Sequence, residues 1–236
     1  MELFFSNKKS KVNYIIDDTS FTTVDVPTEI FYPVEKQNTV NFGCPATSSL
    51  EHRLYYIPSF ADIEIEFGLE NGEAVFTYTF NDSQLRASPA THTLLREMFT
   101  VDITEKNSIV NFQFVLPYLF VTDDKSIEIN ALVPNIKTDN CTFMAGGFNI
   151  YGWIRHINSS WILNNKNKKA KIYFKQGEPL VYIYFNKAVN LKETEFNSNI
   201  YKYHKSHSKS VNYVKNLTKI FNRVIKKRPK KLLWKK

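Results

Sequence analysis

The chain has 236 residues, of which 43% are hydrophobic, 23% are charged and 15% are aromatic, and its formal net charge is +8. This length allows a large core without disulfide or metal support, and the low glycine and proline content argues against a disordered or collagen-like chain. Two cysteines are too few for a disulfide framework, and the longest apolar run, residues 114–121, is too short to cross a membrane. We therefore expect a globular protein that is neither secreted nor transmembrane.

Short strand-like runs in the first third of the chain predict a β protein. They are residues 12–16, 22–26, 29–34, 53–57, 60–67 and 74–80. Residues 62–67 alternate between acidic and apolar side chains, and this period of two predicts one solvent-exposed and one buried face. Asn71 and Gly72 both tolerate positive φ, so this pair predicts a tight hairpin between the last two runs.

The middle of the chain continues the β pattern. The runs there are residues 100–103, 109–121 and 126–133, and residues 88–98 are compatible with a short helix. Pro117 interrupts the longest run, and because proline has no N–H to donate, we expect an edge position or a bulge there. Asp123 and Asp124 predict a turn, and residues 134–140 predict a loop.

The last β segments follow Gly146 and Gly147. A tryptophan-rich segment at residues 148–163 comes first, and residues 171–175 and 179–185 then predict a second hairpin. Taken together, these runs predict a mainly β fold with an antiparallel β-sandwich or jelly-roll-like body at residues 1–200.

Residues 201–236 differ from the body in period and in charge. Apolar residues at steps of three and four predict an amphipathic helix that begins near Ser210 and ends before Pro229. This segment holds 13 lysines and arginines and no acidic residue, whereas residues 1–201 have a net charge of about −5. We interpret it as a basic helix and tail that contacts nucleic acid or an acidic partner. A solvated end, or a helix packed on the body, would explain the same pattern.

The candidate contact residues in this basic segment are Lys215, Lys219, Arg223, Lys226, Lys227, Arg228, Lys230 and Lys231. Lysines that contact phosphates need no fixed geometry, so a segment without a rigid structure can supply them.

Catalytic and metal-binding motifs are not evident. The five histidines are scattered, and the chain has neither a zinc or facial-triad signature nor a phosphate-binding glycine loop or nucleophile turn. Asp62, Glu64 and Glu66 share one predicted strand face, where they form either a divalent-cation site or simply a solvated surface. We therefore predict no catalytic residue, no metal ligand and no cofactor.

Tyr151, Trp153, Arg155 and Trp161 form the densest cluster of side chains that could bind a ligand. Aromatic rings beside arginine can form a stacking platform for bases or sugars. Aromatic residues at alternating positions of a β protein also serve as core and cross-strand pairs, and this alternative stays open.

Four segments carry a family resemblance: GCPA at residues 43–46, FVTDD at 120–124, GFNIYGWIR at 147–155 and KQGEPLVYIYF at 175–185. In this order they resemble uncharacterised β-rich proteins of tailed phages that infect marine bacteria. The resemblance spans about residues 40–190 and implies a location in the host cytoplasm or the virion. It implies no activity.

The same C-terminal β segment is distantly similar to the trimeric dUTPase β fold, whose turn Gly177 and Glu178 could match. The catalytic acid of that family would fall near Asn149 and Tyr151, where this chain has no carboxylate. Without a general base at that place the family's water activation is not expected, so the likeness concerns the fold alone.

We interpret the chain as a non-enzymatic structural or accessory protein of a phage particle. Its expected partners are other viral proteins or further copies of itself, with nucleic acid as a partner of the basic segment. One alternative is a dUTPase-like nucleotide hydrolase or a metal-dependent oxygenase on a β scaffold. Another is a peripheral membrane-surface protein, because a basic amphipathic helix followed by Trp234 also suits anionic lipid.

Overall fold

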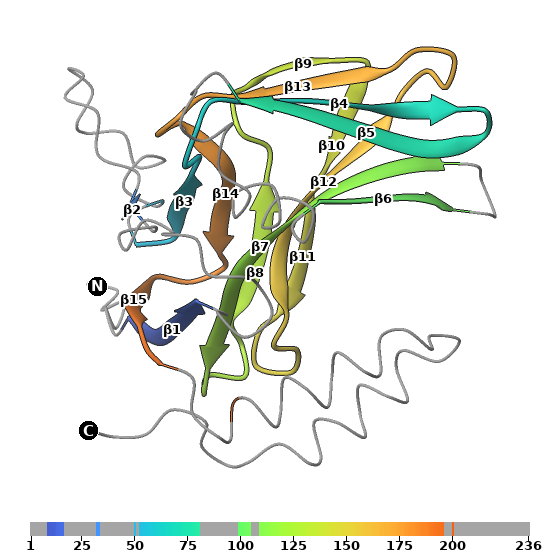
Figure 1. The fold of residues 1–236 in the computed structure, drawn as a ribbon. Coiled ribbons are helices and arrows are strands. Elements are labelled where there is room, and N and C mark those ends of the chain that lie inside the picture. The colour runs from blue at the N-terminus through green and yellow to red at the C-terminus, as the bar shows by residue number, and fades with distance from the viewer. Residues whose placement is uncertain are drawn as a thin grey trace, which may run out of the picture.

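The computed structural model describes residues 9–16, 32–33, 50, 52–80, 99–104, 109–195 and 200. This part of the chain is mainly β, and its strands form three sheets (Figure 1). Every pairing among the described strands is antiparallel except that of β1 with β15. The predicted mainly β class is therefore confirmed for the described residues.

The sheets have six, five and four strands. The six-stranded sheet runs β10 (Cys141–Met144), β12 (His156–Leu163), β7 (Ile109–Thr122), β1 (Ser10–Ile16) and β15 (Val189–Glu193), with β6 (Phe99–Thr104) also paired to β7. The five-stranded sheet runs β11 (Gly146–Asn149), β8 (Glu128–Leu132), β14 (Pro179–Phe185), β3 (Leu54–Pro58) and β2 (Tyr32–Pro33). The four-stranded sheet runs β5 (Glu73–Phe80), β4 (Ile63–Glu70), β13 (Ala170–Phe174) and β9 (Lys137–Asp139).

The hairpin of β4 and β5 forms as predicted. Asn71 has φ of 53° and Gly72 has φ of 83°, the two left-handed positions that a two-residue hairpin turn requires. Ile63 and Ile65 are fully buried, while Glu64 between them is exposed. The alternating pattern of the sequence thus sets which face of β4 enters the core.

Pro117 lies in the middle of β7 at a change of pairing. On one edge of β7, β6 pairs up to Phe114 and β1 pairs from Tyr118 onward. On the other edge, the register of β12 shifts between His156 and Asn158. No described strand therefore needs a backbone N–H donor at residue 117. The predicted bulge is confirmed, whereas the predicted edge position is wrong because β7 has strands paired on both sides.

Aromatic side chains join the sheets into one core. Phe67 of the four-stranded sheet stacks on Phe112 of β7 with ring centroids 5.0 Å apart, and Phe99 of β6 meets Phe114 at 4.7 Å. Phe120 of β7 meets Phe185 of the five-stranded sheet at 6.0 Å. These contacts belong to a single buried cluster that includes strands of all three sheets.

A second, smaller cluster covers the opposite face of β1 and the end of β7. It consists of Ile15, Leu119, Val121, Ile154 and Ile200. Ile200 is completely buried, so the chain reaches the predicted end of the body while packed on the six-stranded sheet. Residues 201–236, with the predicted helix, lie outside the described residues.

The predicted hairpin of residues 171–175 and 179–185 is wrong. Both strands form, and Gly177 between them has a positive φ of 79°, but β13 and β14 enter different sheets. The loop that joins them is bound to the loop between β3 and β4, through Ser59 N–H to Glu178 O at 2.7 Å and Gly177 N–H to Ser59 O at 2.8 Å. The β3–β4 and β13–β14 loops, which lie side by side, therefore both cross between the five-stranded and the four-stranded sheet, and no hairpin forms.

The segment at residues 134–140 is not a loop throughout. The loop predicted at residues 134–140 contains the short strand β9, which pairs with β13 and so becomes part of the four-stranded sheet.

The predicted strand at residues 22–26 and helix at 88–98 lie outside the described residues. In the part of the chain that the structure describes, no helix has the length and apolar character needed to cross a bilayer.

Candidate functional site

The connection between β11 and β12 is held by Asn149. Its Oδ1 atom accepts hydrogen bonds from the N–H groups of Tyr151 at 3.0 Å and Gly152 at 3.1 Å, and its amide donates to Lys125 O at 2.9 Å. The N–H of Trp153 donates to Asn149 O at 3.1 Å. Asn149 therefore fixes the turn from which Trp153 and Arg155 extend.

Arg155 lies against two aromatic rings. Its guanidinium carbon is 4.6 Å from the ring centroid of Trp153 and 5.4 Å from that of Phe148. The two rings meet edge to face with centroids 5.8 Å apart and planes at 64°. The negative faces of such rings attract a cation, so these cation–π contacts position the guanidinium group.

The hydrogen-bond partners of Arg155 are uncharged. Nε donates to the carbonyl oxygen of His156 at 3.3 Å, and one terminal nitrogen donates to Asn158 Oδ1 at 3.2 Å. Asn158 in turn donates to Gln113 Oε1 at 3.0 Å. Among the described residues no carboxylate lies within ion-pair distance of Arg155. Burial lowers the pKa of Arg155 from its usual value, but an arginine remains charged at neutral pH.

A pocket of about 140 Å³ lies beside this guanidinium group, and we call it the Arg155 pocket. Polar and aromatic walls come from Arg155, Trp153, Phe148 and Asn158, and apolar walls come from Ala131, Met144 and Ile157. Gly146 and Gly147, both exposed, form its rim. The pocket therefore combines one cation with an apolar lining.

The structure separates the predicted aromatic platform. Trp153 and Arg155 come together, whereas Tyr151 lies near Lys125, whose Nζ atom is 5.9 Å from the tyrosine ring. Trp161 is only 1% exposed, meets Phe143 edge to face at 5.0 Å and donates from its indole to Ser159 Oγ. Trp161 is thus a core residue, as the alternative interpretation states.

Phe148 is the pocket residue that the sequence argument missed. Phe148 lies on β11, where it pairs with Ile129 of β8, just before the turn that positions Trp153. The tryptophan-rich segment begins at Phe148, but its contact with Arg155 depends on the turn between the strands. A local pattern contains no signal for that contact.

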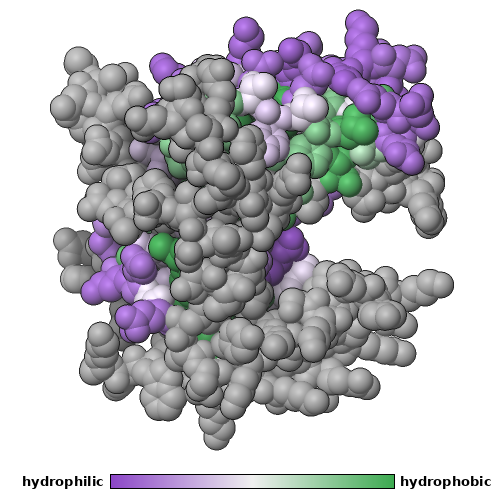
Figure 2. Space-filling view, viewed as in Figure 1, coloured by the Kyte–Doolittle hydropathy of each residue, from purple (hydrophilic) through white to green (hydrophobic). Residues whose placement is uncertain are grey.

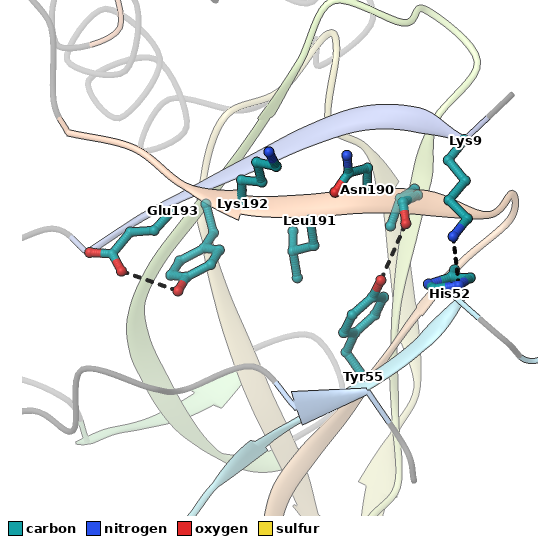
Figure 3. Close-up of a pocket in the computed structure, with 9 residues that line it drawn as sticks. Lys9, His52, Tyr55, Asn190, Leu191, Lys192 and Glu193 are labelled. Atoms are coloured by element: carbon teal, nitrogen blue, oxygen red, sulfur yellow. Dashed lines mark hydrogen bonds between the residues drawn. The ribbon is translucent and has the colours of Figure 1, made fainter. Parts of the chain in front are cut away.

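A larger cavity of about 400 Å³ lies between the β1–β15 pair and β3 (Figure 3). Leu191 and Tyr55 point toward one another across it, whereas Asn190 and Lys192 point away. The hydroxyl of Tyr55 donates to the carbonyl oxygen of Val189 at 3.3 Å. Burial raises the pKa of Tyr55 to about 12, so this hydroxyl stays a neutral donor at physiological pH.

The two ends of this cavity carry opposite charge. At one end Lys9 Nζ lies 2.6 Å from His52 Nε2, and at the other the hydroxyl of Tyr14 donates to Glu193 at 3.2 Å (Figure 3). His52 adopts a left-handed φ of 58°, a conformation that is uncommon for a residue other than glycine. The cavity has the size of a small-molecule site, which typically measures about 300–1,000 Å³.

The predicted row of carboxylates, Asp62, Glu64 and Glu66, at β4 is paired with Lys169 and Lys171 or with backbone. Lys171 lies 3.1 Å from Glu64 and 3.4 Å from Glu66, and Lys169 lies 3.4 Å from Glu66. Asp62 accepts a hydrogen bond from the N–H of Gln176 at 2.7 Å. Hydrophilic side chains gather over this sheet at the top of Figure 2. The row is therefore a charged, solvent-facing ladder.

Other reactive groups are inert or outside the described residues. Burial and the nearby Asp139 raise the pKa of Cys141 to about 11, so its thiol is protonated and weakly nucleophilic at neutral pH. In the described ranges, no three histidine, cysteine or acidic side chains gather as a metal site. Cys44 lies outside the described residues, as do the predicted basic contact residues Lys215, Lys219, Arg223, Lys226, Lys227, Arg228, Lys230 and Lys231.

Comparison with known proteins gives no family assignment. No protein-family model matches the chain, and no curated protein shows significant sequence similarity to it. The resemblance to tailed-phage proteins and the likeness to the dUTPase fold therefore stay predictions.

Proposed function

We propose that this protein is a non-enzymatic structural or accessory protein of a phage particle. A body of β-sandwich or jelly-roll type makes protein–protein contacts, and the basic segment at residues 201–236 contacts nucleic acid or an acidic partner. The uneven charge carries this proposal: 13 lysines and arginines follow residue 201, while the rest of the chain has a net charge of about −5.

The body supplies the second support. Its three sheets share one buried cluster, so the described strands have a core of their own. Its outermost strands include β10 and β11, which border the Arg155 pocket, and sheet edges are places where another chain can pair. A half-buried arginine beside those edges suits a contact with an acidic partner.

The test of the basic segment is a chain that ends after residue 208. This end retains Ile200 and its contacts with the six-stranded sheet, so we expect the body to remain folded. Binding to DNA and RNA oligonucleotides, measured by fluorescence anisotropy over a range of salt, should fall to background. For the full chain, affinity should decrease steeply with salt, because each neutralised phosphate releases counterions.

A matched pair of full-length variants tests whether binding depends on where the positive charges lie or only on the total charge of the chain. The first replaces Lys226, Lys227, Arg228, Lys230 and Lys231 with glutamine. The second replaces five exposed body lysines, Lys125, Lys137, Lys166, Lys168 and Lys187, in the same way. The first should lose nucleic-acid binding and the second should retain it. Equal binding by the truncated chain at low salt would contradict the role of the segment, and absence of the protein from purified virions would contradict the particle assignment.

The larger cavity favours one second candidate, a nucleotide-binding or other small-molecule function. Its volume of about 400 Å³ and its opposite charges at Lys9 and Glu193 suit a polar ligand. A ligand that binds only the folded state raises the melting temperature, so nucleotides at millimolar concentration should raise it by a few degrees. An unchanged melting temperature across the four common nucleotides and deoxyuridine triphosphate would exclude that candidate.

A further inference from the structure

We propose that the Arg155 pocket receives the carboxylate of a glutamate or aspartate side chain from an extended segment of a partner protein. This inference rests on the proposed function, because it names the kind of partner group that the body would bind. Four observations carry it: a charge with no carboxylate partner among the described residues, the contact with two aromatic rings, the size of the pocket and the neighbouring strand edges.

The first observation is a charge without a counter-charge among the described residues. Arg155 is half-buried, and among the described residues its polar partners are the carbonyl oxygen of His156 and the side chain of Asn158. A guanidinium group has five N–H donors, and these bonds use two of them. Desolvation of an ion is unfavourable unless an opposite charge compensates it. A carboxylate supplied from outside would provide that compensation.

The second observation is the orientation of the group. The rings of Trp153 and Phe148 lie against the guanidinium at 4.6 and 5.4 Å from its central carbon. The two ring centroids are only 5.8 Å apart, so both rings lie on one side of the guanidinium group, and an incoming acceptor reaches its N–H groups from the side away from the rings. A carboxylate fits this approach, because its two oxygens accept parallel hydrogen bonds from the edge of arginine. The ring contacts also hold the Arg155 side chain in place before binding, which lowers the entropic cost of binding.

The third observation is size. A volume of about 140 Å³ equals the share of four to five water molecules, at about 30 Å³ each in the liquid. Sites for nucleotides and similar ligands are typically larger, about 300 Å³ or more. The space therefore suits one acidic side chain, and Ala131, Met144 and Ile157 offer apolar contacts to its methylene groups.

The fourth observation is the position of the pocket between two sheet edges. β11 is the last strand of the five-stranded sheet, and β10 ends the six-stranded sheet. Gly146 and Gly147 on the rim have no side chains to shield the backbone, and Met144 is 47% exposed. An extended segment that pairs with such an edge would place alternate side chains toward the pocket.

The test uses full-length protein and two probes that differ only in charge, N-acetyl-glutamate methylamide and N-acetyl-glutamine methylamide. The readout is the indole N–H signal of Trp153 in nuclear magnetic resonance spectra, assigned with Trp153→Phe. The buried indole of Trp161 reports whether the fold is intact. We expect the glutamate probe to shift the Trp153 signal at millimolar concentration and to bind at least about tenfold more tightly than the glutamine probe.

Arg155→Lys retains a positive charge but loses the planar fork, so it should weaken binding of the glutamate probe about tenfold or more. Wild-type binding should also disappear as the pH falls below about 4.3, where the probe carboxyl becomes protonated, and this measurement needs no variant. Equal binding of the two probes, or unchanged binding by Arg155→Lys, would overturn the proposal. Inorganic phosphate binding more tightly than the glutamate probe would overturn it in favour of a phosphate site.

The experiment also separates this inference from the proposed function. Nucleic-acid binding by the basic segment does not involve Arg155, so Arg155→Lys should leave it unchanged. Absence of glutamate-probe binding by the wild-type chain, with intact nucleic-acid binding, would refute only the inference. Carboxylate binding by a chain that is absent from virions would refute only the particle assignment.

Discussion

At the four-stranded sheet Lys169 and Lys171 face carboxylates of β4, whereas at the Arg155 pocket a cation faces aromatic rings and uncharged oxygens. The lysine ladder lies in solvent, where ion pairs contribute little to stability and need no partner from outside. Arg155 is half-buried, so its charge has lost part of its hydration. The comparison shows that the setting of a basic side chain, more than its charge, distinguishes a structural surface from a candidate binding surface.

The largest expected effect comes from closing the space beside the pocket with Gly147→Ala. An added Cβ would overlap the side-chain oxygen of Asn130 and lie 3.0 Å from the carbonyl oxygen of Ile129. Overpacking of this kind should lower the free energy of unfolding by about 1–3 kcal/mol, measured by urea denaturation. Gly146→Ala is the matched control: its Cβ would meet no atom within 4 Å, so stability should stay within about 1 kcal/mol of wild type.

If both glycine variants were equally stable, the rim of the pocket would not be tightly packed. The view of the Arg155 pocket as a preformed site would then fail.

Arg155→Met tests whether the charge of Arg155 contributes to the stability of the fold. A buried ion pair that loses one partner typically costs about 3–5 kcal/mol. Arg155 has no carboxylate partner among the described residues, and methionine retains apolar contact with Trp153 and Phe148. We therefore expect the free energy of unfolding to change by less than about 1 kcal/mol, while carboxylate binding is lost. Lys166→Met, at an exposed position, is the control for added hydrophobicity.

A destabilisation of about 3 kcal/mol or more by Arg155→Met would place Arg155 in an internal ion pair. That result would mean that Arg155 stabilises the fold and is not held ready for a ligand.

Local sequence patterns predict much of the fold but little of the pairing between distant strands. The hairpin at Asn71 and Gly72 and the bulge at Pro117 follow from the conformations and hydrogen bonds that those residues allow. The same logic predicts the strands β13 and β14, but it wrongly pairs them, because their partners are decided by the core. A turn signal shows that the chain changes direction, and only the packing of sheets decides which sheet it enters.

The site shows the same division. The cluster of Trp153 and Arg155 is visible in the sequence because both residues lie in one short segment. Phe148 joins it only through the turn held by Asn149, and Trp161, six residues after Arg155, points into the core. The lysine ladder is also invisible in sequence, since Lys171 and Glu64 are 107 positions apart and meet through the pairing of β13 with β4.

The smallest expected effect comes from the ladder itself. Hydrogen bonds and charge from Glu64 and Glu66 raise the pKa of Lys171 above its usual 10.5. A cation with a raised pKa contributes its stability fully below the unfolded value and loses it as the pH rises through the folded value. The melting temperature of Lys171→Gln should therefore lie slightly below that of wild type at pH 7, and the difference should vanish in strongly alkaline buffer. High salt at pH 7 should reduce the same difference, because exposed ion pairs are screened. A difference that persisted in both conditions would mean that Lys171 acts through packing, and the ladder would then resemble the half-buried Arg155 more than a solvated surface.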